Sequence, residues 1–297
     1  MLSQENCKIC DKKGSIFFSK EYSDDEFKNY FENFYGHQSF NLINNYIGKN
    51  KYELLKCEKC EFVWQKFAPE EKFAYTLYEE IIDKKKSFQK SKLLQEKRKI
   101  RYQDEFEFIF NYFHNKKINI LDFGAGWGSW LNVIDNPKVD KYAFELSPSR
   151  KKYLIEEGIK VLDQISIEKY QGFFDYIRIE QVLEHVVDIN LILKLLKKIA
   201  KDNCIVHIGV PNGKKEILKS HKIIIKKGAV QPLEHLNCFS NKSLKKALIK
   251  YNFEPIKLKQ IIFTHLKNNK FSLEKLRFLA KDILDYFFST SIKFKLK

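Results

Sequence analysis

The chain is 297 residues long and 44% of its residues are hydrophobic, which is enough for one large domain and a smaller one. It has no apolar run of 18 residues, and Met1–Asn6 lacks the basic and then apolar pattern of a signal peptide, so we expect a cytoplasmic protein without a transmembrane segment. The formal net charge is +16, but only five of the 54 basic residues are arginine, the residue that phosphate recognition favours, so charge alone does not predict a nucleic-acid partner.

Two Cys-x-x-Cys pairs are the first chemical signal along the chain. Two intervening residues let one tight turn present both sulfur atoms to one metal ion. In a reducing compartment such pairs predict a tetrathiolate zinc site rather than disulfides. Unrelated surface thiols and a redox dithiol are the alternatives. The candidate ligands of a structural Zn²⁺ ion are Cys7, Cys10, Cys57 and Cys60.

The residues around these pairs have their own structural signals. A strand is expected over Ser15–Phe18 and a helix over Asp24–Phe31. Lys51–Lys56 and Phe62–Trp64 flank the second cysteine pair and predict a β-hairpin that carries it. We therefore expect a zinc-binding module over residues 1–68.

A mainly helical connector is expected over residues 69–115, beginning at Pro69. Its lysine-rich part, Lys84–Arg101, is typical of a solvated helix face more than of a nucleic-acid patch.

Three glycines at alternate positions follow the apolar run Ile118–Phe123. This pattern predicts a buried strand and a tight turn, where a Cβ would be forbidden and a ligand approaches the main chain. We expect a helix over 128–135. A dinucleotide site would need a further glycine where Ser129 stands, so no pyrophosphate-binding pattern is complete. Asp122, just before the turn, suits a cationic ligand better than a phosphate.

Four more strands are predicted after the turn. The second, Lys141–Leu146, carries Glu145 at its end, 21 residues after Gly124 (145 − 124), where a carboxylate can accept from both hydroxyls of a ribose. The others are expected at Ile159–Leu162, Phe174–Glu180 and Cys204–Asn212, and helices near 148–157, 188–201 and 241–251 lie between and after them. This alternation predicts a doubly wound, mostly parallel α/β sheet over residues 116–265.

The glycine turn, the acid that closes the second strand, the Phe-Asp-x-Ile strand with Leu-Glu-His-Val after it, and the Val-Pro-Asn ending together resemble a class I S-adenosylmethionine (SAM)-dependent methyltransferase, over roughly residues 95–260. The resemblance implies a Rossmann-like fold with SAM as cofactor. It implies that the turn backs the methionine portion of SAM, Glu145 holds the ribose, Asp163 lies near the adenine amino group, and Asp122 favours the cationic donor or orients the turn. The candidate cofactor-binding residues are Asp122, Gly124, Ala125, Gly126, Glu145, Leu146, Asp163 and Glu180.

Glu184, His185 and His235 are the candidate catalytic residues. In some RNA 2′-O-methyltransferases and ubiquinone-pathway enzymes that this region resembles, a Glu-x-x-Glu-His motif and a later histidine bind a divalent metal, but Gln181 stands here in place of the first glutamate. Bracing of the loop, general-base chemistry and metal ligation all remain open. The other histidines are expected to be non-catalytic: His37, His114, His207, His221 and His265.

A zinc module joined to such a domain resembles bacterial methyltransferases associated with sugars and surface glycans. We therefore expect a SAM-dependent methyltransferase of a small molecule or glycan, with a sugar or sugar nucleotide as acceptor. An RNA 2′-O- or base methyltransferase and a non-enzymatic zinc-ribbon interaction protein on a degenerate SAM fold are the alternatives. Tyr75, Tyr78 and Phe239 are candidates for lining the acceptor pocket. Residues 266–297 are expected to form a helical extension, with a helix over 271–289.

Overall fold

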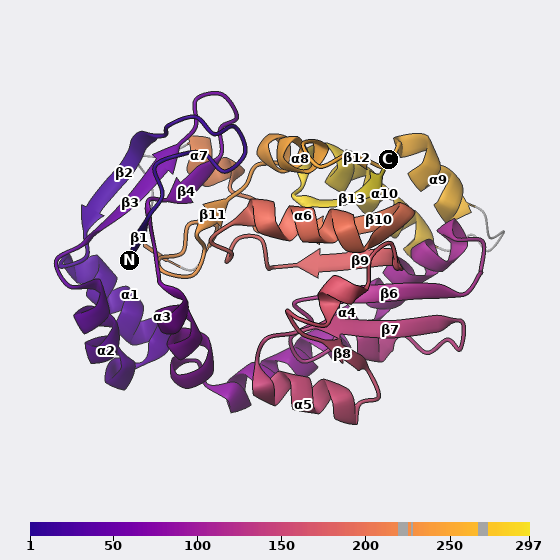
Figure 1. The fold of residues 1–297 in the computed structure, drawn as a ribbon, viewed down its shortest axis with the longest axis horizontal. Helices are drawn as coiled ribbons and strands as arrows, with labels where there is room; N and C mark the ends of the chain where they lie inside the picture. The colour runs from indigo at the N-terminus through magenta and orange to yellow at the C-terminus, as the bar shows by residue number, and fades with distance from the viewer. Residues whose placement is uncertain (219–224, 227, 267–272) are drawn as a thin grey trace. The chain divides into compact units, whose positions relative to one another are not determined.

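The computed structural model describes residues 1–218, 225–226, 228–266 and 273–297 (Figure 1). The chain forms two compact units, and each is assembled from three separate segments. The first unit consists of Met1–Lys84, Leu183–Asn190 and Pro211–Ala247, and the second of Lys85–Val182, Leu191–Val210 and Leu248–Lys297.

The first unit contains a four-stranded antiparallel sheet in the order β11-β4-β3-β2. Its strands are β2 (Ser15–Glu21), β3 (Lys51–Lys56), β4 (Val63–Gln65) and β11 (Asn237–Cys238). The predicted hairpin around the second cysteine pair is confirmed as β3 and β4. The fourth strand was not predicted: β11 comes from far along the chain and pairs Asn237 with Trp64.

The described part of the first unit also contains a two-stranded ribbon, most of α8 (Asn241–Ile249) and five further helical segments. The ribbon pairs β1 (Leu2–Ser3) with β5 (Phe67–Ala68). The helical segments are α1 (Asp25–Tyr35), α2 (His37–Ile47), α3 (Glu71–Thr76), a π-helix (Leu77–Ile81) and α7 (Lys214–Leu218).

Helix α1 shows how the sequence determines this packing. The carboxylate of Asp24 caps the helix by accepting from the Glu26 N–H at 2.9 Å. Phe27 and Phe31, one helical turn apart, are fully buried. They pack in a core that also includes Val230 and other residues of the segment Pro211–Ala247. The core of the first unit is therefore formed by residues far apart in the sequence.

The second unit is built on a seven-stranded sheet in the order β12-β13-β10-β9-β6-β7-β8. The five predicted strands are confirmed as a parallel group, and Figure 1 shows β9, β6 and β7 side by side. The chain changes direction across the sheet at β6, which pairs with both β7 and β9. The parallel strands are β6 (Ile118–Phe123), β7 (Val139–Phe144), β8 (Lys160–Leu162), β9 (Phe174–Glu180) and β10 (Ala200–Gly209).

Two antiparallel strands that were not predicted extend the sheet, and one of them corrects the expectation that residues 266–297 form only a helical extension. β13 (Ser291–Leu296) pairs with β10, and β12 (Phe253–Pro255) pairs with β13. The sheet is therefore mixed at one side and parallel elsewhere, as in doubly wound folds that carry antiparallel edge strands.

The remaining helices are α4 (Lys84–Tyr112), α5 (Pro148–Glu156), α6 (Ile189–Ile199), α8 (Asn241–Ile249), α9 (Leu258–Leu266) and α10 (Leu273–Phe288). The predicted helices near 148–157, 188–201 and 241–251 are confirmed. The helix predicted over 271–289 is confirmed from Leu273; its first two residues lie outside the described part of the chain. Across the described residues, no helix combines the length and the apolar character needed to cross a membrane.

The helix predicted over 128–135 is wrong. Only one turn of 3-10 helix forms there, at Leu131–Val133. Gly128 has φ +69°, a left-handed conformation that an α-helix does not accept. Pro137 follows closely, and the residue before a proline is pushed away from helical angles. The segment is too short between these two constraints for a longer helix.

Candidate functional site

The glycine turn after β6 has the backbone that its sequence predicts. Gly124, Gly126 and Gly128 all have positive φ, at 80°, 57° and 69°. A Cβ at Gly124 would lie 2.5 Å from Cγ2 of Val182, so this glycine also allows close packing. A Cβ at Gly126 would meet no heavy atom within 4 Å. The turn therefore presents open main chain at Gly126, where a ligand can approach.

Glu145 follows β7, and its carboxylate forms a hydrogen bond with the glycine turn. Its Oε2 accepts a hydrogen bond from the Gly126 N–H at 2.8 Å, and its Oε1 accepts from the N–H groups of Leu146 and Ser147 at 2.9 and 3.0 Å. An ionised carboxylate has about four acceptor positions, so capacity remains for a ligand hydroxyl. The Leu146 side chain beside it is 58% exposed and offers an apolar contact.

Asp122 interacts with a cation of the chain itself. Its buried carboxylate Oδ1 lies 3.5 Å from Nη1 of Arg178, on the neighbouring strand β9. Burial raises the pKa of Asp122 to about 6, and Arg178 opposes that shift. Both roles expected of Asp122 stay predictions.

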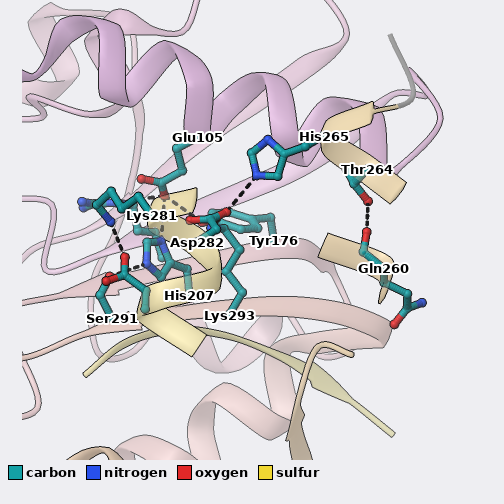
Figure 2. A network of polar contacts seen from close by, with 12 residues as sticks. Glu105, Tyr176, His207, Gln260, Thr264, His265, Lys281, Asp282, Ser291 and Lys293 are labelled. Atoms are coloured by element: carbon teal, nitrogen blue, oxygen red, sulfur yellow. Dashed lines mark hydrogen bonds and ion pairs between the residues drawn. The ribbon is translucent and has the colours of Figure 1, made fainter. Parts of the chain in front are cut away.

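Arg178 belongs to a buried polar network beside the sheet that the sequence did not reveal. Its Nε lies 3.3 Å from Oε1 of Glu105, a residue of α4. The same oxygen accepts from the Tyr176 hydroxyl at 2.8 Å and lies 2.9 Å from Nδ1 of His207 (Figure 2). Burial alone would raise the pKa of Glu105, but His207 and Arg178 outweigh it and hold that pKa below its ordinary value. The network joins α4 to the central strands.

A second part of this network attaches the C-terminal elements. Asp282 of α10 contacts Nε2 of His265 at 3.0 Å and accepts from Nζ of Lys293, a residue of β13, at 2.8 Å (Figure 2). His207 and His265 therefore have structural contacts, in keeping with their predicted non-catalytic role. His221 lies outside the described residues.

Glu180 and Asp163 lie at the ends of β9 and β8. Within the described chain, Oε2 of Glu180 is buried and has no hydrogen-bond partner, and it lies 3.9 Å from Nη2 of Arg178. Oδ1 of Asp163 accepts from the N–H groups of Ile165 and Ser166, so this exposed carboxylate closes its own turn. The predicted adenine contact of Asp163 stays a prediction.

These candidate SAM residues gather at one edge of the sheet. Gly124, Glu145 and Asp163 each follow the carboxyl end of a parallel strand, and β6 is the position where the strand order reverses. Open α/β sheets bind ligands at this edge, next to such a reversal. The second unit thus brings the candidate residues to the edge at which such sheets bind ligands, and their contact with SAM stays a prediction.

In the first unit the four candidate zinc ligands come together. All four cysteines have unpaired thiols, and their sulfur atoms lie within 4.8 Å of one another. The Sγ atoms of Cys7 and Cys60 are 3.5 Å apart. A tetrahedral zinc ion with Zn–S bonds of about 2.3 Å would place its sulfurs about 3.8 Å apart, so the cluster fits this metal.

The two cysteine turns have matching backbones. The Asp11 N–H donates to the carbonyl of Cys7 at 2.7 Å, and the Glu61 N–H donates to that of Cys57 at 2.8 Å. Asp11 and Glu61 have left-handed φ values of 57° and 62°. This repeated turn aims both sulfurs of each pair at one point.

Glu184, His185 and His235 also come together in the first unit. One ligand atom from each lies within 4.8 Å of the others. Oε1 of the buried Glu184 lies 3.8 Å from Nε2 of His185. The sequence predicted these three residues as one candidate set, and the structure places them in one cluster, which we call the Glu–His cluster.

Backbone carbonyl groups lie beside one ring nitrogen of each histidine. Nδ1 of His185 lies 3.0 Å from the carbonyl oxygen of Glu234, and Nδ1 of His235 contacts the carbonyl of Gly228. Because a carbonyl only accepts, Nδ1 of His235 is a donor and its lone pair is on Nε2. Nδ1 of His185 has a second neighbour, the Tyr78 hydroxyl, which can donate to it or accept from it. The tautomer of His235 suits a general base or a metal ligand.

Tyr78 is the aromatic residue that reaches this cluster, with its hydroxyl 2.8 Å from Nδ1 of His185. Burial, together with His235, lowers the pKa of His185 to about 3, so this ring is neutral near neutral pH. Tyr75 is exposed, whereas Phe239 is fully buried against Phe62. The suggestion that Phe239 lines an acceptor pocket is therefore wrong, because its ring belongs to the core of the first unit.

The model of a protein family described as a methyltransferase domain matches residues 94–258, which is more than half of the chain. A comparison with curated proteins finds no match. The chain is similar to a SAM-dependent methyltransferase from Archaeoglobus fulgidus, with 18% identity, a TM-score of 0.38, and coverage of 76% of this chain and 100% of that one.

Two further solved structures are similar. The first is a SAM-dependent methyltransferase from Aquifex aeolicus, with 19% identity, a TM-score of 0.36, and coverage of 48% of this chain and 75% of that one. The second is phosphoethanolamine N-methyltransferase 2 from Haemonchus contortus in complex with SAM, with 17% identity, a TM-score of 0.37, and coverage of 61% and 49%.

Proposed function

The chain belongs to the methyltransferase-domain family and is a SAM-dependent methyltransferase, and from this premise we propose that it methylates a small molecule or glycan, with a sugar or sugar nucleotide as acceptor. The observation that carries the proposal is the Glu–His cluster. Two imidazole rings, a carboxylate and a tyrosine hydroxyl form a compact polar group suited to a substrate hydroxyl.

The SAM-binding part of the proposal rests on the glycine turn. Open main chain at Gly126 supports an approach by the methionine portion, and the Glu145 carboxylate beside it supports a grip on the ribose hydroxyls. Leu146 offers an apolar contact, and Asp163 would lie near the adenine. SAM, when bound, supplies a methyl group already activated by its sulfonium. The chain's own task is to position the acceptor and to remove its proton.

We assign the base to His235. Its Nδ1–H is held by the Gly228 carbonyl, which directs the lone pair to Nε2. Glu184 and His185 lie within reach of the same point. Neutral His185 adds no positive charge that would disfavour protonation of His235.

A divalent metal held by the cluster is the second candidate for its chemistry. Two imidazoles and one carboxylate are a common set of protein ligands, and a backbone carbonyl lies beside Nδ1 of each ring, as is common for metal-bound histidines. Gln181 in place of a second acid weakens such a site for a hard cation. Adding Mg²⁺, Mn²⁺ or a chelator during methyl transfer separates the two roles.

The four cysteines would hold a structural zinc ion. Zinc has no redox chemistry, and four thiolates leave no open position for a substrate, so its contribution would be to the folding of the N-terminal residues.

A methyl-transfer screen with radiolabelled SAM tests the acceptor class. We expect transfer to a sugar or sugar nucleotide and none to bulk RNA. Transfer to RNA alone would overturn the acceptor assignment and favour the RNA-modifying alternative, whereas SAM binding with no transfer to either class would leave the Glu–His cluster without its proposed role.

A further inference from the structure

Lys8 lies inside the first cysteine turn and reaches out of it. Its Nζ donates a hydrogen bond to Oδ1 of Asn237 at 2.6 Å. An ammonium group only donates, so the atom of Asn237 that faces it must be the oxygen. This contact therefore defines the orientation of the Asn237 amide.

The other end of that amide holds the loop that carries the Glu–His cluster. Nδ2 of Asn237 donates to the carbonyl groups of Leu183 and Val186, at 2.8 and 2.7 Å. These two residues flank Glu184 and His185 in the sequence. Both amide hydrogens are thus used on the two sides of the pair.

Backbone contacts strengthen the same connection. The Asn237 N–H donates to the carbonyl of Glu184 at 3.0 Å, and Nδ2 of Asn190 donates to the carbonyl of Lys8 at 2.9 Å. Asn237 is 1% exposed, so water cannot readily replace a lost partner. Through β11, Asn237 is also paired with Trp64 in the strand that follows the second cysteine turn.

We propose that Lys8 and Asn237 are positioning residues, through which the zinc-binding turns hold the Glu184–His185 loop in its working geometry. The inference rests on the proposed function of the Glu–His cluster. It adds a second role for the zinc site: the metal that orders the cysteine turn also orders Lys8, and Lys8 orders the Asn237 amide. Loss of zinc would then loosen the Glu–His cluster, although none of its residues is a zinc ligand.

A double-mutant cycle tests this connection. The variants are Lys8→Met, which keeps the aliphatic stem and removes the ammonium, Asn237→Ser, and the two combined. Lys12→Met is the matched control, because this exposed lysine belongs to the same turn region. The measurements are zinc content, SAM affinity, the nitrogen NMR signal of the His185 ring, and methyl-transfer kinetics.

We expect each single variant to retain zinc and to bind SAM within about twofold of wild type, while kcat falls roughly 10- to 100-fold, as misplacement of reacting groups does. The His185 ring signal should shift or broaden. The double variant should be no less active than the less active of the two single variants, because both changes break one connection. Lys12→Met should match wild type.

Additive losses in the double variant, or an unchanged His185 signal in both single variants, would overturn the connection. Removal of zinc from wild type by a thiol-reactive reagent should change the same His185 signal; an unchanged signal would overturn the role of the metal. The NMR readout requires no acceptor, so a failure of the proposed methyl acceptor is distinguishable from a failure of this coupling.

Discussion

The rings of His185 and His235 meet edge to face, with centroids 4.7 Å apart and planes at 79°, although 50 positions of sequence separate them (235 − 185). Nδ1 of each ring lies beside a backbone carbonyl, so both rings are held by main-chain contacts. The pair therefore has a defined geometry before any ligand arrives, which is what an acid–base or ligand role requires.

Replacing His235 with alanine should lower the methyl-transfer rate roughly 10²- to 10⁴-fold, the usual contribution of a positioned base. SAM affinity should stay near wild type, because the candidate SAM residues belong to the other unit. Turnover measured with saturating SAM, beside calorimetric SAM binding, checks both points. His37→Ala, at an exposed position, is the control. Wild-type turnover in His235→Ala would remove this residue from the chemistry.

The low pKa of His185 predicts a pH dependence of stability. Its pKa is about 3 in the folded chain and 6.5 ordinarily, so folding favours the neutral ring. The contribution is present above about pH 6.5 and is lost as the pH falls from 6.5 toward 3. Unfolding free energies of wild type and His185→Asn should therefore diverge over that window, by up to about 1.4 kcal/mol per pH unit. Parallel curves would contradict the neutral, buried ring.

Glu145→Ala should weaken SAM binding by about 1.5–3 kcal/mol, through loss of a charged acceptor for the ribose. The same change removes the partner of the Gly126 N–H, so part of the loss would come from a looser turn. Calorimetry measures the affinity, and the exposed Glu156→Ala on α5 is the control. Unchanged affinity would exclude Glu145 from the cofactor site.

Arg178→Met should destabilise the protein by about 3–5 kcal/mol, because the buried carboxylates of Asp122 and Glu105 would lose their shared cation. The guanidinium also lies over the rings of Tyr102 and Trp130, at 5.6 and 5.4 Å, which methionine only partly replaces. Denaturant unfolding gives the difference, with Arg277→Met at an exposed position of α10 for comparison. A loss below about 1 kcal/mol would mean that the network is not stabilising.

Purified protein should contain about one zinc ion per chain, and a Cys57→Ser/Cys60→Ser variant should contain none. Because metal binding contributes to folding, the N-terminal residues of that variant should become sensitive to protease. Glu58→Ser/Lys59→Ser alters the same turn without touching a thiol and should behave like wild type. Metal-free wild-type protein with a protease-resistant N-terminus would disprove the zinc assignment.

The elements with local signals could be predicted from the sequence. The glycines after β6 adopt the left-handed angles that their spacing predicts, and each of the five parallel strands contains apolar residues that mark it in the sequence. The strand β13 also had a usable signal, since Ile292, Phe294 and Leu296 alternate with lysines and all three are buried. The helix expected at 128–135 failed because it was extended through Gly128 toward Pro137, both of which oppose helix.

Side-chain contacts between elements far apart in the sequence could not be predicted. Glu105 on α4 and Arg178 on β9 are unremarkable in their own segments, and only the fold brings them to 3.3 Å. Asn237 is similar: it follows a noted histidine, but its contacts to Lys8 and Val186 depend on how β11 joins the sheet. Candidate catalytic and metal-binding residues could be recognised from their type and spacing. The residues that position them could not.

The origin of β11 has a consequence for synthesis on the ribosome. The sheet of the N-terminal unit lacks its edge strand until Asn237 and Cys238 have been made, 170 residues after Ala68 (238 − 68). At about 5–20 residues per second, β4 would wait roughly 10–30 s for its neighbour. Until then, the nascent N-terminal residues would expose the unpaired edge of β4. Early zinc binding by the cysteine turns would stabilise the incomplete sheet until β11 has been synthesised.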